Sequence, residues 1–221
     1  LTTTLAGMGG GTLLVLALAL LYDPLTALAL STPALFVGNL HRLSVYRRHI
    51  VWSEARPLVL GGLLGAVVGG FLAAGLPAWL IQALMVGMAV LALGKALGLP
   101  FRPPAKATLP VAGVVGLVSA TSGGGGLIAG PYLLARGLVG VPYVATGAVG
   151  AAAVHLGKLG AYTSAGLSTW DTLGRGLVLA LLIAGGNVAG ERLRRHLGEG
   201  RQETLQVGVM VACVGMALAG L

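Results

Sequence analysis

The chain has 221 residues, of which 56% are hydrophobic and only 9% are charged. Soluble domains carry about 25% charged residues, so this composition excludes an ordinary soluble protein, and the high hydropathy excludes a disordered chain. Three stretches, 57–94, 107–135 and 204–221, contain no acidic or basic residue. A transmembrane helix needs about 20 mostly apolar residues. The sequence therefore predicts an all-α polytopic membrane protein in a lipid bilayer. Because the net charge of +8 lies mostly between apolar segments, it indicates topology rather than a nucleic-acid partner.

Apolar segments follow one another along the whole chain. They lie at about 5–22, 25–46, 55–75, 78–98, 108–137, 141–165, 172–190 and 204–220. Between the fourth and fifth, residues 99–107 contain three prolines and two cations, which is typical of a loop. We therefore expect a first repeat over 1–98, a linker over 99–107 and a second repeat over 108–221.

The two halves resemble each other in sequence. Gly7–Thr12 aligns with Ser122–Leu127 at an offset of 115, and His41 precedes His155 by 114. Internal repeats of this kind are common in transporters. In this register the start of the second repeat corresponds to position −7, so we expect the start of the first helix to precede Leu1.

The few basic residues predict the membrane topology. Basic clusters occur at 47–56, 95–106 and 192–201. If all eight segments spanned the bilayer, the last cluster would face the opposite side from the first two, against the positive-inside rule. If segments 5–22 and 108–137 instead enter and return on one side, the clusters share a face with Arg136. We therefore expect two inverted repeats, each with a glycine-broken re-entrant hairpin and three transmembrane helices.

Glycine clusters interrupt both proposed hairpins. Irregular backbone at membrane depth persists only where it is buried in protein or lines a polar cavity, and a half-helix that begins there presents free N–H groups. These features predict a site for a small anion between two hairpin tips, although glycine also serves close helix packing. The candidate residues are Gly9, Gly10, Gly11, Thr12, Ser119, Thr121, Ser122, Gly124, Gly125 and Gly126.

Polar residues within apolar segments extend the candidate site. His155 and Lys158 share one helical face, where the lysine would attract the anion and the histidine would carry a proton. Alternatively, Lys158 snorkels to the interface and His155 bonds a carbonyl group. Asn39 either lines the path or bonds across helices. His41 and Arg42 lie nearer the basic end of their segment, where we expect an interfacial position.

The stretch Gly116–Leu134 resembles the TauE/SafE sulfite exporter family, also called the toluene sulfonate uptake permeases. The resemblance rests on its serine, its glycine run and the following Pro131-Tyr132-Leu133, and the first half repeats the pattern over 6–16. Two departures are Val15-Leu16 in place of the usual proline and Ala120 in place of a glycine. The resemblance implies a multi-pass carrier of sulfite, thiosulfate or an organosulfonate in the bacterial plasma membrane.

Taken together, these patterns predict a secondary transporter for a small sulfur-containing anion that works by alternating access. All six acidic residues lie in loops or at helix ends, which is unlike a cation transporter. We expect no enzymatic activity, no cofactor and no metal site. The alternatives are an anion channel, and a membrane-embedded phosphatase or lipid-modifying enzyme. The sequence assigns neither a direction of transport nor an oligomeric state.

Overall fold

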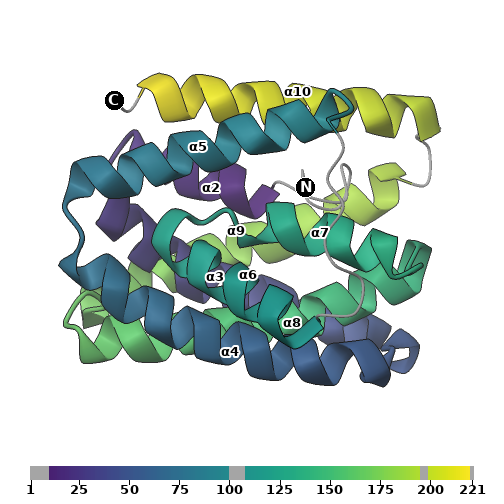
Figure 1. Ribbon diagram of the computed structural model, residues 1–221, viewed down its shortest axis with the longest axis horizontal. Helices are drawn as coiled ribbons and strands as arrows, with labels where there is room; N and C mark the ends of the chain where they lie inside the picture. Colours follow the sequence, from purple (N-terminus) through teal and green to yellow (C-terminus); the bar gives the residue numbers. More distant parts are fainter. Residues whose placement is uncertain (1–9, 100–107, 195–198, 220–221) are drawn as a thin grey trace.

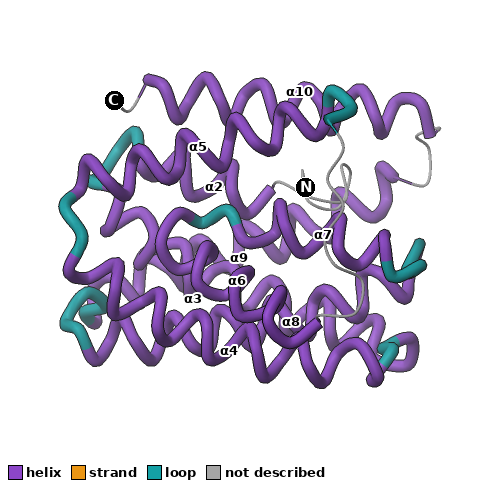
Figure 2. The backbone as a smooth tube through the Cα atoms, in the orientation of Figure 1, coloured by secondary structure: helices purple, strands orange, loops and turns teal. Residues whose placement is uncertain are grey.

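The computed structural model describes residues 10–99, 108–194 and 199–219, and these residues form only helices and their connections (Figure 2). The all-α prediction is therefore confirmed over the described part of the chain. The helices are α2 (Gly10–Ala19), α3 (Pro24–Tyr46), η1 (Arg47–His49), α4 (Trp52–Gly75), α5 (Ala78–Ala96), α6 (Thr108–Ser122), α7 (Gly125–Ala135), α8 (Gly140–Ser164), α9 (Trp170–Arg194) and α10 (Glu199–Ala219).

Local sequence signals determine where α3 begins. Asp23 is its N-cap, and one carboxylate oxygen accepts hydrogen bonds from the backbone N–H groups of Leu25 and Thr26, at 3.1 and 3.0 Å. Pro24 occupies the first helical position, where no intrahelical donor is needed. Partial burial acts to raise the pKa of Asp23, but the hydrogen bonds from Thr26 and Leu25 outweigh it and hold the pKa below its ordinary value.

Helix α4 lies at the centre of the packing and uses glycine to approach two neighbours. A methyl group built on Gly65 would lie 2.0 Å from the carbonyl oxygen of Gly113 in α6, and one on Gly70 would lie 2.5 Å from Ala161 in α8. Small residues allow such backbone contact between helices in membranes. The contacts between α4 and α6 advance in the same direction along both helices, because Gly61 contacts Leu109 and Gly69, two turns later, contacts Leu117. Helices α4 and α6 therefore run parallel.

The opposite side of α4 carries large apolar side chains. Leu60, Leu64 and Val68 are each more than half exposed, as is expected of a surface that faces lipid. Among the described helices, α4 and α8 are long and apolar enough to cross a membrane by length and composition. Trp52, Trp79 and Trp170 are exposed at helix starts, a position that is typical of tryptophans at the membrane–water interface.

The helices of the two halves follow the same order. The predicted break in the fifth apolar segment is confirmed, because α6 ends at Ser122 and α7 begins at Gly125. Helix α2 begins at Gly10, 115 residues before α7, which equals the offset of the glycine clusters. The linker 99–107 and Gly9 lie almost wholly outside the described residues. The inverted relation of the halves and their boundaries stay predictions.

Helices α5 and α10 form a layer at one side of the bundle (Figure 1). The side-chain amide of Gln82 in α5 donates to the carbonyl oxygen of Ala217 in α10 at 2.9 Å. A buried apolar cluster joins this layer to the rest of the molecule. The cluster includes Val15, Leu16, Leu28, Ile81, Met85, Tyr162 and Cys213.

Candidate functional site

The start of α2 meets the glycine turn between α6 and α7 in the folded chain. Gly123 follows α6 with a φ of +72°, a conformation that favours glycine, and Gly124 is the N-cap of α7. The hydroxyl of Thr12, in the first turn of α2, donates to the carbonyl oxygen of Gly123 at 3.3 Å. A methyl group built on Gly123 would lie 3.0–3.2 Å from the side chain of Val15. Segments 111 residues apart therefore touch at the starts of α2 and α7.

The three glycines at the start of α7 lie in different surroundings, so an added side chain would have a different effect at each position. A methyl group on Gly125 would lie 2.5 Å from the carbonyl oxygen of Val115 and 2.6 Å from Cβ of Ser119, so close packing of α6 against α7 requires glycine there. A methyl group on Gly124 would meet Met88 at 2.8 Å. Gly126 instead faces open space and is exposed. The first N–H groups of α7 have no acceptor within the helix, so this end of α7 presents hydrogen-bond donors and partial positive charge.

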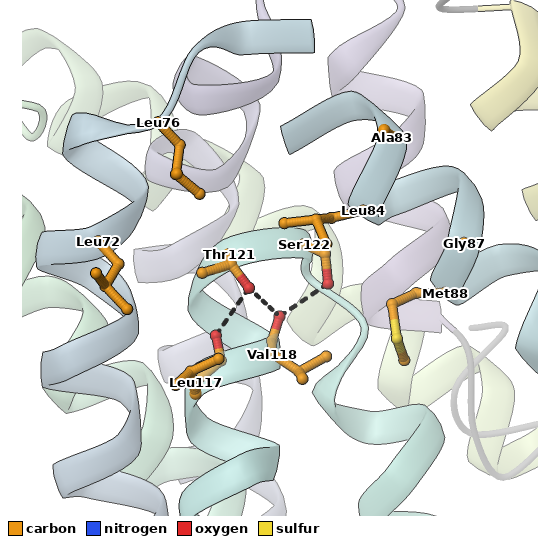
Figure 3. A pocket seen from close by; sticks show the side chains of 10 residues that line it. All are labelled: Leu72, Leu76, Ala83, Leu84, Gly87, Met88, Leu117, Val118, Thr121 and Ser122. Carbon is orange, nitrogen blue, oxygen red and sulfur yellow. Dashed lines mark hydrogen bonds between the residues drawn. The ribbon is translucent and has the colours of Figure 1, made fainter. Parts of the chain in front are cut away.

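The hydroxyl groups of Thr121 and Ser122 are already bonded within α6. Thr121 donates to the carbonyl oxygen of Leu117 at 3.0 Å, and Ser122 to that of Val118 at 2.9 Å (Figure 3). Both residues line a cavity of about 370 Å³ between α4, α5 and α6. Its other lining residues are apolar: Leu72, Leu76, Ala83, Leu84, Gly87, Met88, Leu117 and Val118. In this conformation the cavity offers no free hydroxyl donor to an anion.

Lys158 lies fully inside the protein. Its side chain is 0% exposed, and its ammonium nitrogen has no hydrogen-bond partner among the described residues. It therefore does not snorkel to the interface. The nitrogen lies 5.7 Å from the ring centre of Tyr162, one turn further along α8. The Tyr162 hydroxyl donates to the carbonyl oxygen of Ala120 at 2.5 Å, so this face of α8 is tied to α6 just before Gly123.

The remaining predicted site residues differ in their burial and in their hydrogen-bond partners. His155 is 7% exposed, and its Nδ1 atom has no hydrogen-bond partner within the described chain. Asn39 is buried, but its amide donates to the carbonyl oxygen of Leu35 in its own helix at 2.8 Å, not across helices. Gly10 and Gly11 begin α2, and Gly11 faces Leu35. The described residues contain no group of three His, Cys, Asp or Glu side chains arranged to hold a metal ion.

Arg42 is a residue that the sequence analysis did not assign to the site. Its Nε atom is buried, as is Nδ1 of His41, and neither has a hydrogen-bond partner among the described residues. A sequence signal was present, because Arg42 follows Asn39 by three residues and so shares its helical face. Its place near a basic loop instead favoured an interfacial interpretation.

The comparison with known families decides what kind of protein carries these features. The family model described as sulfite exporter TauE/SafE matches residues 1–219. The chain belongs to the TauE/SafE family. No curated protein and no solved structure matches it. This TauE/SafE protein is therefore an integral membrane protein of a transporter family, and its two long apolar helices agree with that.

Proposed function

We propose that this TauE/SafE protein is a secondary transporter that holds a small sulfur-containing oxyanion between its two hairpin tips. Sulfite is the substrate that the family description names, and thiosulfate and organosulfonates present similar oxyanion groups to the same donors. The observation that carries the proposal is the contact between Thr12 and Gly123, which joins the starts of two half-helices. Two converging helix N-termini suit an anion, since both present N–H donors and partial positive charge.

The buried ammonium group of Lys158 supports the same proposal. A buried ion costs several kcal/mol of desolvation, and only an opposite charge or good hydrogen bonds offset that cost. Lys158 has neither within the described chain, so a bound oxyanion would supply the missing partner. His155, one turn away and equally without a bond at Nδ1, would hold or pass a proton as the anion moves.

The arrangement of the helices supports an inverted repeat. In Figure 1 the connections α2–α3, α4–α5 and α8–α9 lie at one end of the bundle, whereas α3, α5, α7 and α9 finish at the other. The predicted basic clusters follow α3, α5 and α9, so they would share one face. This agrees with the positive-inside rule and with a multi-pass protein in a bacterial plasma membrane.

Packing indicates which parts would move during alternating access. Helix α4 of the first half packs closely on α6 and α8 of the second, and α3 packs on α8 and α9. The sequence halves are therefore interleaved rather than separable. Helices α5 and α10 contact α2, α3 and α6 less closely than α4 contacts α6 and α8, and the 370 Å³ cavity lies between α5 and the α4–α6 pair. We place the moving boundary there, since packed cores shift as units.

Flux and binding measurements test the proposal. In proteoliposomes we expect saturable uptake of labelled sulfite that is accelerated by unlabelled sulfite on the other side. Unsaturable, ohmic anion current would contradict a carrier and favour the channel alternative. Thermal-shift titrations with sulfite, thiosulfate, sulfoacetate and matched carboxylates would rank the substrates, and the absence of stabilisation by any anion would overturn the site.

A tip variant with a matched control tests where the anion binds. Gly124→Leu would push against Met88, and we expect it to weaken sulfite-induced stabilisation at the hairpin tips. Gly174→Leu adds the same side chain at an exposed α9 position with no atom within 4 Å, and we expect it to bind sulfite normally. Equal binding by the two variants would contradict the tip assignment.

A further inference from the structure

Three cationic or ionisable side chains lie along the contact between α3 and α8. Lys158 and His155 belong to α8, and Arg42 belongs to α3, which packs against α8. Each has a buried nitrogen without a hydrogen-bond partner among the described residues: Nζ of Lys158, Nδ1 of His155 and Nε of Arg42. The charges of both Lys158 and Arg42 act on His155, so the three groups are electrostatically coupled.

Among the described residues, no carboxylate acts on the guanidinium group of Arg42. The charged or ionisable neighbours that act on its guanidinium group are Tyr143 and Tyr46, and neither is a carboxylate. The nearest acidic residue in sequence, Glu54, is paired with Arg136. A guanidinium group offers five N–H donors in a planar fork that matches an oxyanion. Arg42 as a whole is half-buried, but its Nε donor is buried and unpaired among the described residues, so a bound oxyanion could accept a hydrogen bond from it.

The three groups are ordered from the hairpin tips towards one end of the bundle. Lys158 lies one turn before Tyr162, which contacts Ala120 near the second tip. His155 lies one turn nearer the start of α8. Arg42 lies near Tyr143 in the first turn of α8, and the backbone N–H of Val51 just beyond α3 donates to the hydroxyl of Thr146 at 3.1 Å. The start of α8 thus meets the end of α3.

We propose that Arg42 forms a second oxyanion-binding station, separated from the hairpin tips by His155 and Lys158, through which substrate passes between the tip site and the basic face. This inference rests on the proposed transport function. An anion leaving Lys158 would meet His155 and then the Arg42 guanidinium, so no step along α8 requires an uncompensated anion in a low-dielectric interior.

Calorimetric titration with sulfite tests the station directly. In nanodiscs of zwitterionic lipid, we expect two equivalents of sulfite per wild-type chain and one per Arg42→Gln chain. The remaining equivalent reports that the variant is folded. Arg42→Lys keeps the charge but loses the fork, so we expect two equivalents with the second at least about tenfold weaker. Arg47→Gln, at an exposed arginine of η1, is the control and should retain both.

The outcomes separate this inference from the proposed function. If Arg42→Gln binds as many equivalents as the wild type and transports sulfite at the same rate, the station is refuted while the tip site stands. If the wild type binds no sulfite, the proposed function fails as well. Repeating the titration in nanodiscs of phosphatidylglycerol distinguishes a lipid headgroup: loss of the second equivalent there would assign Arg42 to lipid phosphate and overturn the station.

Discussion

The Thr12 hydroxyl donates a hydrogen bond to the carbonyl oxygen of Gly123 across 111 residues of sequence. This bond joins the first turn of α2 to the turn between α6 and α7. Their contact brings the start of α2 against the turn that precedes α7, where we propose that the anion binds.

Substitution of Gly123 tests whether this contact is needed for binding. Gly123→Ala costs about 1–2 kcal/mol because φ is positive, and it also displaces Val15. We expect sulfite affinity to fall at least about tenfold in calorimetric titration. Gly137→Ala is the matched control, since its φ is +79° with no atom within 4 Å of the added methyl group. A similar loss of affinity in both variants would assign the effect to backbone strain alone.

Lys158→Met should make the protein more stable and less able to bind anion. Methionine fills a similar volume without an unpaired charge, so we expect the midpoint of thermal unfolding in detergent to rise by roughly 4–8 °C, equivalent to about 2 kcal/mol. Sulfite at about 100 times the wild-type Kd should stabilise the wild type by about 2.7 kcal/mol per occupied site, and Lys158→Met should lose the part of this stabilisation that comes from the tip site. Lys158→Arg is the charge-retaining control. A less stable Lys158→Met that responds to sulfite as strongly as the wild type would contradict the assigned role.

Gly65 tests the close contact of α4 with α6. In Gly65→Ala the added methyl group would lie 2.0 Å from a backbone oxygen of Gly113, so the two helices must separate. We expect a loss of about 1–3 kcal/mol in the free energy of unfolding. Gly160→Ala in α8, where nothing lies within 4 Å, should change stability little. Equal thermal midpoints for the two variants would show that α4 and α6 do not approach this closely.

The ion pair of Glu54 with Arg136 ties the first turn of α4 to the end of α7. The hydrogen bond between the two side chains and the negative charge of Glu54 raise the pKa of the Arg136 guanidinium group. The Glu54 side chain is 11% exposed and that of Arg136 is 31% exposed. Arg136→Gln therefore leaves a more deeply buried charge behind, and we expect it to lower the thermal midpoint more than Glu54→Gln does.

A double-mutant cycle separates this pair from the rest of the protein. The combined Glu54→Gln and Arg136→Gln variant should lose less stability than the sum of the single changes, because both charges leave together. Additive losses in thermal unfolding would mean that the two side chains do not interact in the membrane-bound protein.

The sequence by itself determined the class of the protein and the positions of its breaks. Uncharged stretches longer than 20 residues require a membrane or a buried core, so the helices around Leu64 and Val149 follow from composition alone. Glycine readily adopts a positive φ, which ends a helix, and this depends only on the local sequence. The end of α6 beside Gly123 was therefore predictable. The TauE/SafE pattern is local in the same sense, and the family assignment agrees with it.

Only the tertiary structure decided which polar groups are satisfied. The hydroxyl groups of Thr121 and Ser122 donate to backbone carbonyl oxygens of their own helix, α6. The sequence could not predict this, because a serine or threonine in a helix can either bond to the preceding turn or face a ligand. It also could not tell that Lys158 is fully buried rather than snorkelling to the interface, or that the Nε atom of Arg42 has no hydrogen-bond partner among the described residues. Burial and hydrogen-bond partners depend on neighbouring helices far away in the chain, and those contacts arise only when α3, α6 and α8 pack together.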